Sequence, residues 1–168
     1  KLVLPGVGAF PYAFSELCSR GLAEPLKKFV ASGRPLLGIC LGMQLLFDGS
    51  DEFGSNKGLG FIPGWVKKLP VLPEAKLPNI GWAPVLHIKE SFCGSLTQNH
   101  NINPYFYFVH SYHAKPENSK HCVGISYYED VSFCAITQKD NVVGCQFHPE
   151  KSANEGLLIL QKFLEWKI

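Results

Sequence analysis

The sequence has no long apolar run, no basic cluster and no closely spaced cysteines. Its longest strongly apolar run, Pro35–Phe47, has 13 residues and is too short to cross a bilayer as a helix. The 16 Lys and Arg residues against 14 Asp and Glu leave a net charge of only +2, without any Lys/Arg-rich segment. We therefore expect no membrane association and no nucleic-acid partner, because both need an apolar or basic surface.

The six cysteines are scattered along the chain. Disulfide-rich domains carry cysteines at short, regular spacings, so this pattern favours reduced thiols and a cytoplasmic location. Cys145 with His148, and His110 with His113, are spaced like pairs of zinc ligands, but each pair stands alone. We therefore expect no metal and no cofactor.

A chain of 168 residues with 46% hydrophobic residues is long enough for one domain, residues 1–168, with a substantial core. The apolar spacing predicts helices over 12–31 (divided at Gly21 and closed by Gly33), over 41–47, and over 152–166 after a Ser152–Glu155 capping box. Residues 48–57 are expected to form a surface loop, and 58–80 turns around short strands. Strands are predicted over 2–4, 35–39, 65–69, 85–88, 105–109, 122–126, 133–138 and 142–147. This order favours an α/β domain with a central mixed sheet flanked by helices.

The sequence Gly38-Ile39-Cys40-Leu41-Gly42 lies between a buried strand and a helix. This is the context of a nucleophile elbow, in which glycines two residues before and after the nucleophile allow a sharp turn. The following helix presents its first amides and positive end to Cys40, which favours a thiolate, and the amide of Leu41 is placed to bind an oxyanion. The alternative is a small buried cysteine at an ordinary strand–helix junction.

A second motif, His148-Pro149-Glu150, follows the last predicted strand. Residues two apart in an extended segment project to the same side, so Glu150 can orient His148. A cysteine nucleophile needs a base of this kind. The pair therefore completes a Cys-His-Glu triad with Cys40, although a surface histidine beside a helix-start acid is the alternative.

A third motif, Pro5-Gly6-Val7-Gly8, follows the first predicted strand. A glycine-rich turn can present backbone N–H groups to an oxyanion. A plain turn is the alternative, and the Lys-Ser/Thr ending of a phosphate loop is missing.

Together, these three motifs resemble those of class I (triad) glutamine amidotransferases. Three further segments, 58–64, Pro78-Asn79-Ile80-Gly81-Trp82 and 107–112, resemble the glutaminase subunit of imidazole glycerol phosphate synthase. The resemblance covers essentially the whole chain and implies a flavodoxin-like fold. It also suggests that the N-terminus is incomplete, since the family has a strand, a helix and a second strand before the Pro-Gly-Val-Gly turn.

The resemblance implies a reaction as well as a fold. Cys40 would attack the side-chain amide carbon of L-glutamine, and the backbone amides of Leu41, Val7 and Gly8 would bind the oxyanion. His148 would protonate the departing ammonia and then activate water to hydrolyse the glutamyl thioester. Glu150 would hold His148 and stabilise its positive charge.

The family's glutamine pocket maps onto Gly8, Gln44, Tyr107 and Ser111. Simple packing within a strand is the alternative for Tyr107 and Ser111.

In this family the ammonia passes to a partner subunit, a (β/α)₈ synthase or cyclase, and Trp82, Tyr107 and Lys151 match positions near that interface. Core packing is the alternative for Trp82, and a solvated charge for Lys151. The sequence departs from the family pattern at Asn79, where the family has His, and at Ala83, where it has Asn.

Three alternatives to a histidine-pathway glutaminase stay open. A paralogous glutaminase supplies ammonia to a surface-sugar amidotransferase, and Ser111-Tyr112-His113 leans slightly toward it. A free-standing hydrolase, such as a γ-glutamyl peptidase, would work without a partner. A truncated, non-catalytic chain could act as a partner-binding module.

Overall fold

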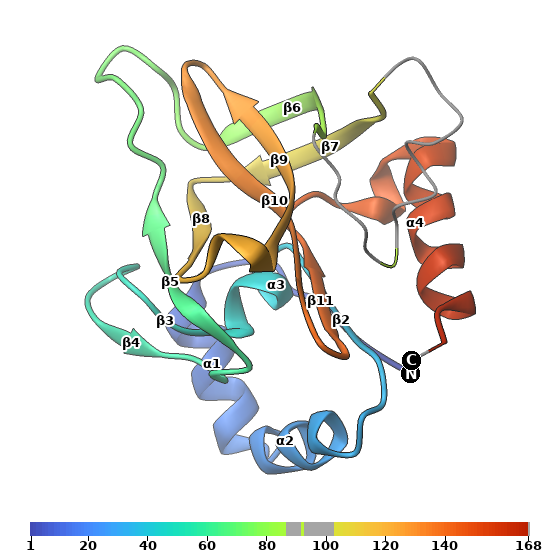
Figure 1. Cartoon of the computed structure of the whole chain (residues 1–168). Helices are drawn as coiled ribbons and strands as arrows, with labels where there is room; N and C mark the ends of the chain where they lie inside the picture. The colour runs from blue at the N-terminus through green and yellow to red at the C-terminus, as the bar shows by residue number, and fades with distance from the viewer. Residues whose placement is uncertain (87–91, 93–102, 168) are drawn as a thin grey trace.

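The computed structural model describes residues 1–86, 92 and 103–167 (Figure 1). Its helices are α1 (Phe10–Ser19), α2 (Ala23–Ala31), α3 (Leu41–Leu45) and α4 (Ala153–Glu165), with short 3₁₀ helices at Ser119–His121 and Pro149–Lys151. Its strands are β1 (Leu2–Leu4), β2 (Leu36–Ile39), β3 (Phe47–Ser50), β4 (Asn56–Lys57), β5 (Ile62–Lys68), β6 (Asn79–Pro84), β7 (Tyr105–His110), β8 (Tyr112–Pro116), β9 (Cys122–Tyr128), β10 (Val131–Lys139) and β11 (Val142–Cys145). None of the helices in these residues is long and apolar enough to cross a membrane.

The central sheet has five strands in the order β1-β2-β11-β10-β9. Strands β1 and β11 run parallel to β2, whereas β10 is antiparallel to both β11 and β9. The predicted mixed sheet is therefore confirmed. The carboxyl end of β2 carries Cys40, and the adjacent end of β11 leads to His148, so the sheet order places the two motifs side by side.

Alternating residues of the sheet supply two hydrophobic cores. Leu36 and Val142 pack in one cluster with buried residues of α1, α2 and α3, whereas Leu37 and Val143 pack in the other with α4. Successive side chains of a strand point to opposite faces, and continuous apolar runs are the mark of a strand that is covered on both faces. Figure 1 shows α1 and α2 gathered at one side of the molecule and α4 at another.

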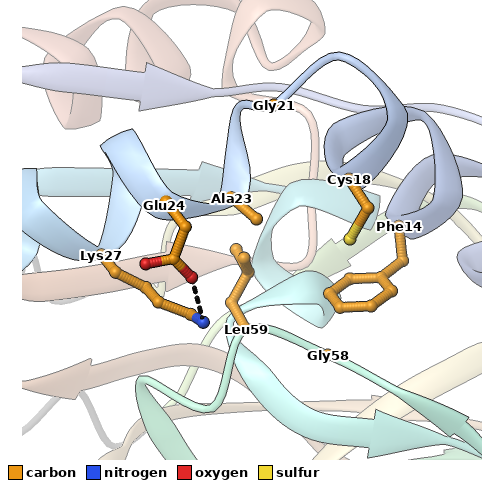
Figure 2. Close-up of a pocket in the computed structure, with 8 residues that line it drawn as sticks. All are labelled: Phe14, Cys18, Gly21, Ala23, Glu24, Lys27, Gly58 and Leu59. Carbon is orange, nitrogen blue, oxygen red and sulfur yellow. Dashed lines mark hydrogen bonds and ion pairs between the residues drawn. The ribbon is translucent and has the colours of Figure 1, made fainter.

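A second sheet has the order β4-β3-β5-β8, and β6 and β7 form a separate antiparallel pair. The α1–α2 corner packs next to this second sheet. There Phe14 and Leu59 line a hollow of about 300 Å³, with a Glu24–Lys27 ion pair of 2.7 Å at its edge (Figure 2). Positive φ values at Gly21 and Gly33 allow the chain to leave α1 and α2, as predicted.

The region after Cys40 differs from the prediction. The helix predicted over 41–47 ends at Leu45, and Phe47 begins β3, which pairs with β5. The predicted surface loop 48–57 therefore contains one strand and part of another. Gly49 explains the tight pairing, because a Cβ there would lie 2.4 Å from the ring of Trp65. Only glycine allows the two strands to approach so closely, and an isolated glycine gave no strand signal.

Other strand predictions also need correction. β5 starts at Ile62, three residues earlier than predicted, and Asn79–Pro84 form β6, although turns were predicted up to residue 80 and no strand was predicted over 81–84. β8 was not predicted. The strand predicted over 85–88 is wrong at its start, since Leu86 forms only an isolated bridge with Ile125; residues 87 and 88 lie outside the described part.

The predicted capping box at the start of α4 is wrong. Ser152 is the N-cap residue, but its side chain caps no N–H of the helix. Its hydroxyl instead donates to the carbonyl of His148 at 2.6 Å and accepts the backbone N–H of Tyr107 at 3.0 Å. The serine thus fastens the His148 loop to β7 rather than starting the helix.

Candidate active site

Cys40 occupies a strained turn between β2 and α3. Its φ of 53° lies in the left-handed region, which residues other than glycine rarely adopt. The flanking glycines leave no room for side chains: a Cβ on Gly38 would lie 2.7 Å from the Gly42 carbonyl oxygen, and a Cβ on Gly42 1.8 Å from that of Leu4. The predicted nucleophile elbow is therefore present in the geometry.

His148 and Glu150 are in direct contact. The Nδ1 atom of His148 lies 2.7 Å from Oε1 of Glu150. A carboxylate only accepts, so Nδ1 carries a proton, and in the neutral ring Nε2 presents its lone pair. In the described part of the chain this buried Nε2 has no hydrogen-bond partner. Such an arrangement suits a general base whose far side is held by a carboxylate.

The loop that carries His148 is fixed from two sides. The backbone N–H of His148 donates to the carbonyl of Tyr107 at 2.9 Å. Ser152 links the same two residues through its hydroxyl. Strand β7 therefore sets the position of the histidine, even though it is far away in the sequence.

The elbow, the histidine and the glycine-rich turn open onto one cavity of about 310 Å³. Seven of the predicted site residues line it: Val7, Gly8, Cys40, Leu41, Gln44, Ser111 and His148. Glu150 lies behind His148 and is half exposed. A volume of this size is enough for a small amino acid.

Tyr107, Trp82 and Lys151 lie together, but outside this cavity. The Tyr107 and Trp82 rings meet edge to face at 6.1 Å between centroids, and the ammonium of Lys151 lies 5.9 Å from the Tyr107 ring. Trp82 is 52% exposed, so it is not a core residue. The structure thus groups the three residues expected at the interface, and it places Tyr107 apart from the other glutamine-pocket positions.

Asn79, one of the two positions at which the sequence differs from the family pattern, contacts a buried histidine. Its side-chain amide lies 3.2 Å from Nε2 of His110. The other ring nitrogen, Nδ1, donates to the carbonyl of Tyr112 at 2.9 Å. Burial lowers the pKa of His110 to about 4, so the ring is neutral. An amide donor at position 79 matches this tautomer, because Nε2 can then accept.

The protonation state of Cys40 differs from the prediction. Burial raises the pKa of the thiol to about 11, although hydrogen bonds from the Leu41 amide and the Gln146 side chain lower it. Desolvation and the nearby Glu150 carboxylate outweigh the contacts that favour the thiolate, so the thiol form predominates at neutral pH. To act as a nucleophile, Cys40 would have to pass its proton to a base, and His148 lines the same cavity.

Sequence reasoning missed five residues that meet at the cavity. Glu52, Val109, His110 and Tyr112 line it, and Gln146 lies behind Cys40. Gln146 lies only two residues before His148, but residues 146 and 147 form a bend, so the spacing alone did not predict its contact with Cys40. No sequence motif pointed to Glu52. Its carboxylate accepts the backbone N–H of Phe10 at 2.8 Å, a contact between segments that are distant in the sequence.

Two further observations bear on the cysteine and metal predictions. Cys18 lines the hollow at the α1–α2 corner, beside Phe14 and Leu59 (Figure 2). It has neither a histidine nor a glycine-flanked turn there, unlike Cys40.

No three His, Cys, Asp or Glu side chains converge as metal ligands would within residues 1–86, 92 and 103–167.

Comparison with known proteins places this geometry in context. Residues 2–166 match the family described as "Glutamine amidotransferase class-I". The chain is 42% identical to "Imidazole glycerol phosphate synthase subunit HisH 1" of Legionella pneumophila (strain Lens), covering 98% of this chain and 80% of that protein. It is 46% identical to the HisH subunit of Desulfitobacterium hafniense (strain DSM 10664 / DCB-2), with 98% and 75% covered.

Solved structures agree on the fold. A crystal structure of a glutamine amidotransferase superposes with a TM-score of 0.68 at 16% identity, covering 97% of this chain and 76% of the other. PurLQS from Thermotoga maritima gives 0.67 at 17% identity, with 97% and 78% covered. The flavodoxin-like fold of this family is thereby confirmed. With a family match over nearly its whole length, the chain belongs to the class I glutamine amidotransferases.

Proposed function

We propose that the protein is the glutaminase subunit of an imidazole glycerol phosphate synthase, which hydrolyses L-glutamine to glutamate and ammonia. The observation that carries this proposal is the cavity shared by Cys40 at its strained elbow and the Glu150-oriented His148. The relatives named HisH support the histidine pathway over the sugar-amidotransferase paralogue.

The reaction begins with a proton transfer. The proton on Sγ of Cys40 moves to Nε2 of His148, and the sulfur attacks the side-chain amide carbon of glutamine. The C=O π electrons move onto oxygen, and the amides of Leu41, Val7 and Gly8 are proposed to bind this oxyanion. Val7 and Gly8 line the same cavity as the elbow, which supports that assignment.

The C–N bond then breaks and His148 gives its proton to the leaving nitrogen, which departs as ammonia. A water molecule next loses a proton to His148 and attacks the thioester, releasing glutamate and restoring the thiol. Glu150 stabilises the imidazolium in both steps without taking up its proton.

Substrate recognition needs a group for each end of glutamine. The α-ammonium requires an anion, and among the described residues that line the cavity Glu52 is the one carboxylate. We place the ammonium there, and we place Gln44, Gly8 and Ser111 around the rest of the substrate. Tyr107 does not line the cavity, so we propose that it acts on the substrate indirectly, by holding the backbone of His148 in place.

A partner surface is proposed on the β6–β7 pair. Ile80, Trp82 and Tyr105 are each at least half exposed, at 61%, 52% and 51%, and Lys151 adds a charge beside them. Exposed aromatic residues of this kind are typical of interfaces. The carbonyl of Val109 on β7 also lies 3.8 Å from Sγ of Cys40, so the strand that would contact the partner also forms part of the active site.

The proposed partner is the (β/α)₈ cyclase subunit, in a heterodimer located in the cytoplasm. Ammonia would pass to it through an internal channel without release to solvent. The cyclase would use it in a lyase reaction to make imidazole glycerol phosphate and the aminoimidazole carboxamide ribonucleotide by-product of histidine biosynthesis.

The substitution Cys40→Ala tests the proposal. We expect hydrolysis of glutamine, measured as released glutamate in the presence of the cyclase subunit, to fall by about 10⁴-fold or more. Cys18→Ala, with the same chemical change at the α1–α2 corner, should retain full activity. The glutamine analogue 6-diazo-5-oxo-norleucine should label Cys40. Hydrolysis that survives Cys40→Ala would contradict the proposal. Full activity of the wild type without a partner would favour a free-standing hydrolase. No hydrolysis by the wild type in the presence of its partner would favour a binding module.

A further inference from the structure

Gln146 is a fully buried amide that touches the proposed nucleophile. It lies between β11 and His148 and has no exposed surface. Its Nε2 atom lies 3.7 Å from Sγ of Cys40, within the range of a hydrogen bond to sulfur. Leaving a buried amide without a partner is unfavourable, so its placement against a cysteine needs an explanation.

The direction of this amide is fixed by its neighbours. The side-chain amide of Gln44 lies 2.9 Å from the backbone carbonyl of Tyr112. A carbonyl only accepts, so Gln44 must present its NH₂ group at that point. The same nitrogen lies 3.1 Å from the Gln146 side chain, which must therefore present its oxygen. The NH₂ group of Gln146 is left to face Cys40.

This contact favours the sulfur anion over the thiol. The neutral thiol has its own acceptor, the Val109 carbonyl at 3.8 Å. Once the proton leaves, that carbonyl presents its negative end to the sulfur and can offer no hydrogen bond. The Gln146 amide, with the Leu41 amide, then supplies the donors, and hydrogen bonds to charged groups are about twice as strong as neutral ones.

We propose that Gln146 is a catalytic residue that donates its amide N–H to the Cys40 thiolate as it forms, and that Gln44 and the Tyr112 carbonyl hold Gln146 in this orientation. This inference rests on the proposed function, in which Cys40 is the nucleophile. No further reactant is needed, because the thiol proton passes to His148. Hydrogen bonds from Leu41 and from Gln146 both lower the pKa of Cys40 against the rise caused by burial, which agrees with this role.

The substitution Gln146→Met tests the proposal, since it keeps the length of the side chain but removes the donor. We expect the rate of Cys40 alkylation by iodoacetamide at pH 8 to fall about tenfold, with its pH profile displaced upward. The kcat for glutamine should fall about 10-fold to 100-fold, with KM changed less than threefold, because the interaction forms in the thiolate state. Gln161→Met, an exposed glutamine on α4, is the matched control.

A second variant guards against a folding defect. Gln146→Glu keeps the volume and the acceptor for Gln44 but replaces the donor with a second oxygen, so alkylation should fall at least as far as in Gln146→Met. A far-ultraviolet spectrum and melting temperature like the wild type will show that each variant folds. An unchanged alkylation profile in a folded Gln146→Met would overturn the proposal. Alkylation needs no glutamine, so it reports on Gln146 even if the proposed glutaminase activity is not found.

Discussion

The two walls of the cavity are built differently. On the first wall, called here the buried wall, Cys40, Leu41, Gln44 and His148 are each less than 7% exposed. Its positions follow from steric exclusion around the elbow glycines and from hydrogen bonds. The second, the open wall, includes Val7, which is 79% exposed, together with Gly8 and Glu52. The contrast teaches that the packed core of the fold holds the proposed catalytic side chains, Cys40 and His148, in place. The residues of the open wall make fewer packing contacts that could fix their positions.

The largest effect should come from Gly42→Ala, at the elbow that holds Cys40 and Leu41 of the buried wall. A Cβ there would lie 1.8 Å from the Leu4 carbonyl oxygen, so β1 and α3 would have to separate. We expect a loss of about 4 kcal/mol or more in the free energy of unfolding, measured by urea denaturation. Gly54→Ala, with a positive φ but open space around it, should cost only about 1 kcal/mol. A Gly42→Ala protein within 1 kcal/mol of the wild type would show that the wall is not sterically fixed.

Acidification should weaken the buried wall by a somewhat smaller amount. The pKa of His110 is lowered by burial from 6.5 to about 4, so folding favours the neutral ring. Its contribution is therefore complete above pH 6.5 and is lost as the pH falls through about 4. The difference corresponds to roughly 3 kcal/mol. The check is urea unfolding at pH 7, 5.5 and 4. His110→Gln should flatten this dependence, and an equally steep curve in that variant would assign the loss to other groups.

The sequence predicted the local motifs of both walls better than the contacts between distant segments. Gly38, Cys40 and Gly42 form a local motif whose spacing indicates the turn. The contact of Glu150 with His148 is also local, although it forms through the 3₁₀ helix Pro149–Lys151 and not through the extended chain that was predicted. The contacts of Glu52 and Gln146 could not be predicted as easily, because they join segments that are distant in the sequence. The same reason explains the missed β6 and β8, whose pairing with β7 and β5 is non-local. The helix predicted over 41–47 failed because β-pairing of Phe47 overrode its local pattern.

On the open wall, the substitution Glu52→Gln is expected to change substrate binding and not stability. The neutral amide can still accept the Phe10 N–H, so we expect the fold to be unchanged. Loss of the charge that faces the glutamine α-ammonium should raise KM about tenfold, or about 1.4 kcal/mol, with little change in kcat. Steady-state kinetics with glutamine will measure both values. Asp48→Asn is the control, since Asp48 does not line the cavity. An unchanged KM in Glu52→Gln would move the ammonium site elsewhere.

Gly8→Ala should affect stability much less than Gly42→Ala. Its φ of +101° disfavours a side chain, but a Cβ there would meet nothing within 4 Å. The cost should therefore be backbone strain alone, about 1 kcal/mol in urea unfolding. Gly8→Ala, on the open wall, and Gly42→Ala, at the elbow beneath the buried wall, make the same chemical change, so the difference between their costs separates strain from steric overlap. If Gly8→Ala proved as costly as Gly42→Ala, the open wall would be as tightly constrained as the buried wall, and the distinction between the two walls would fail.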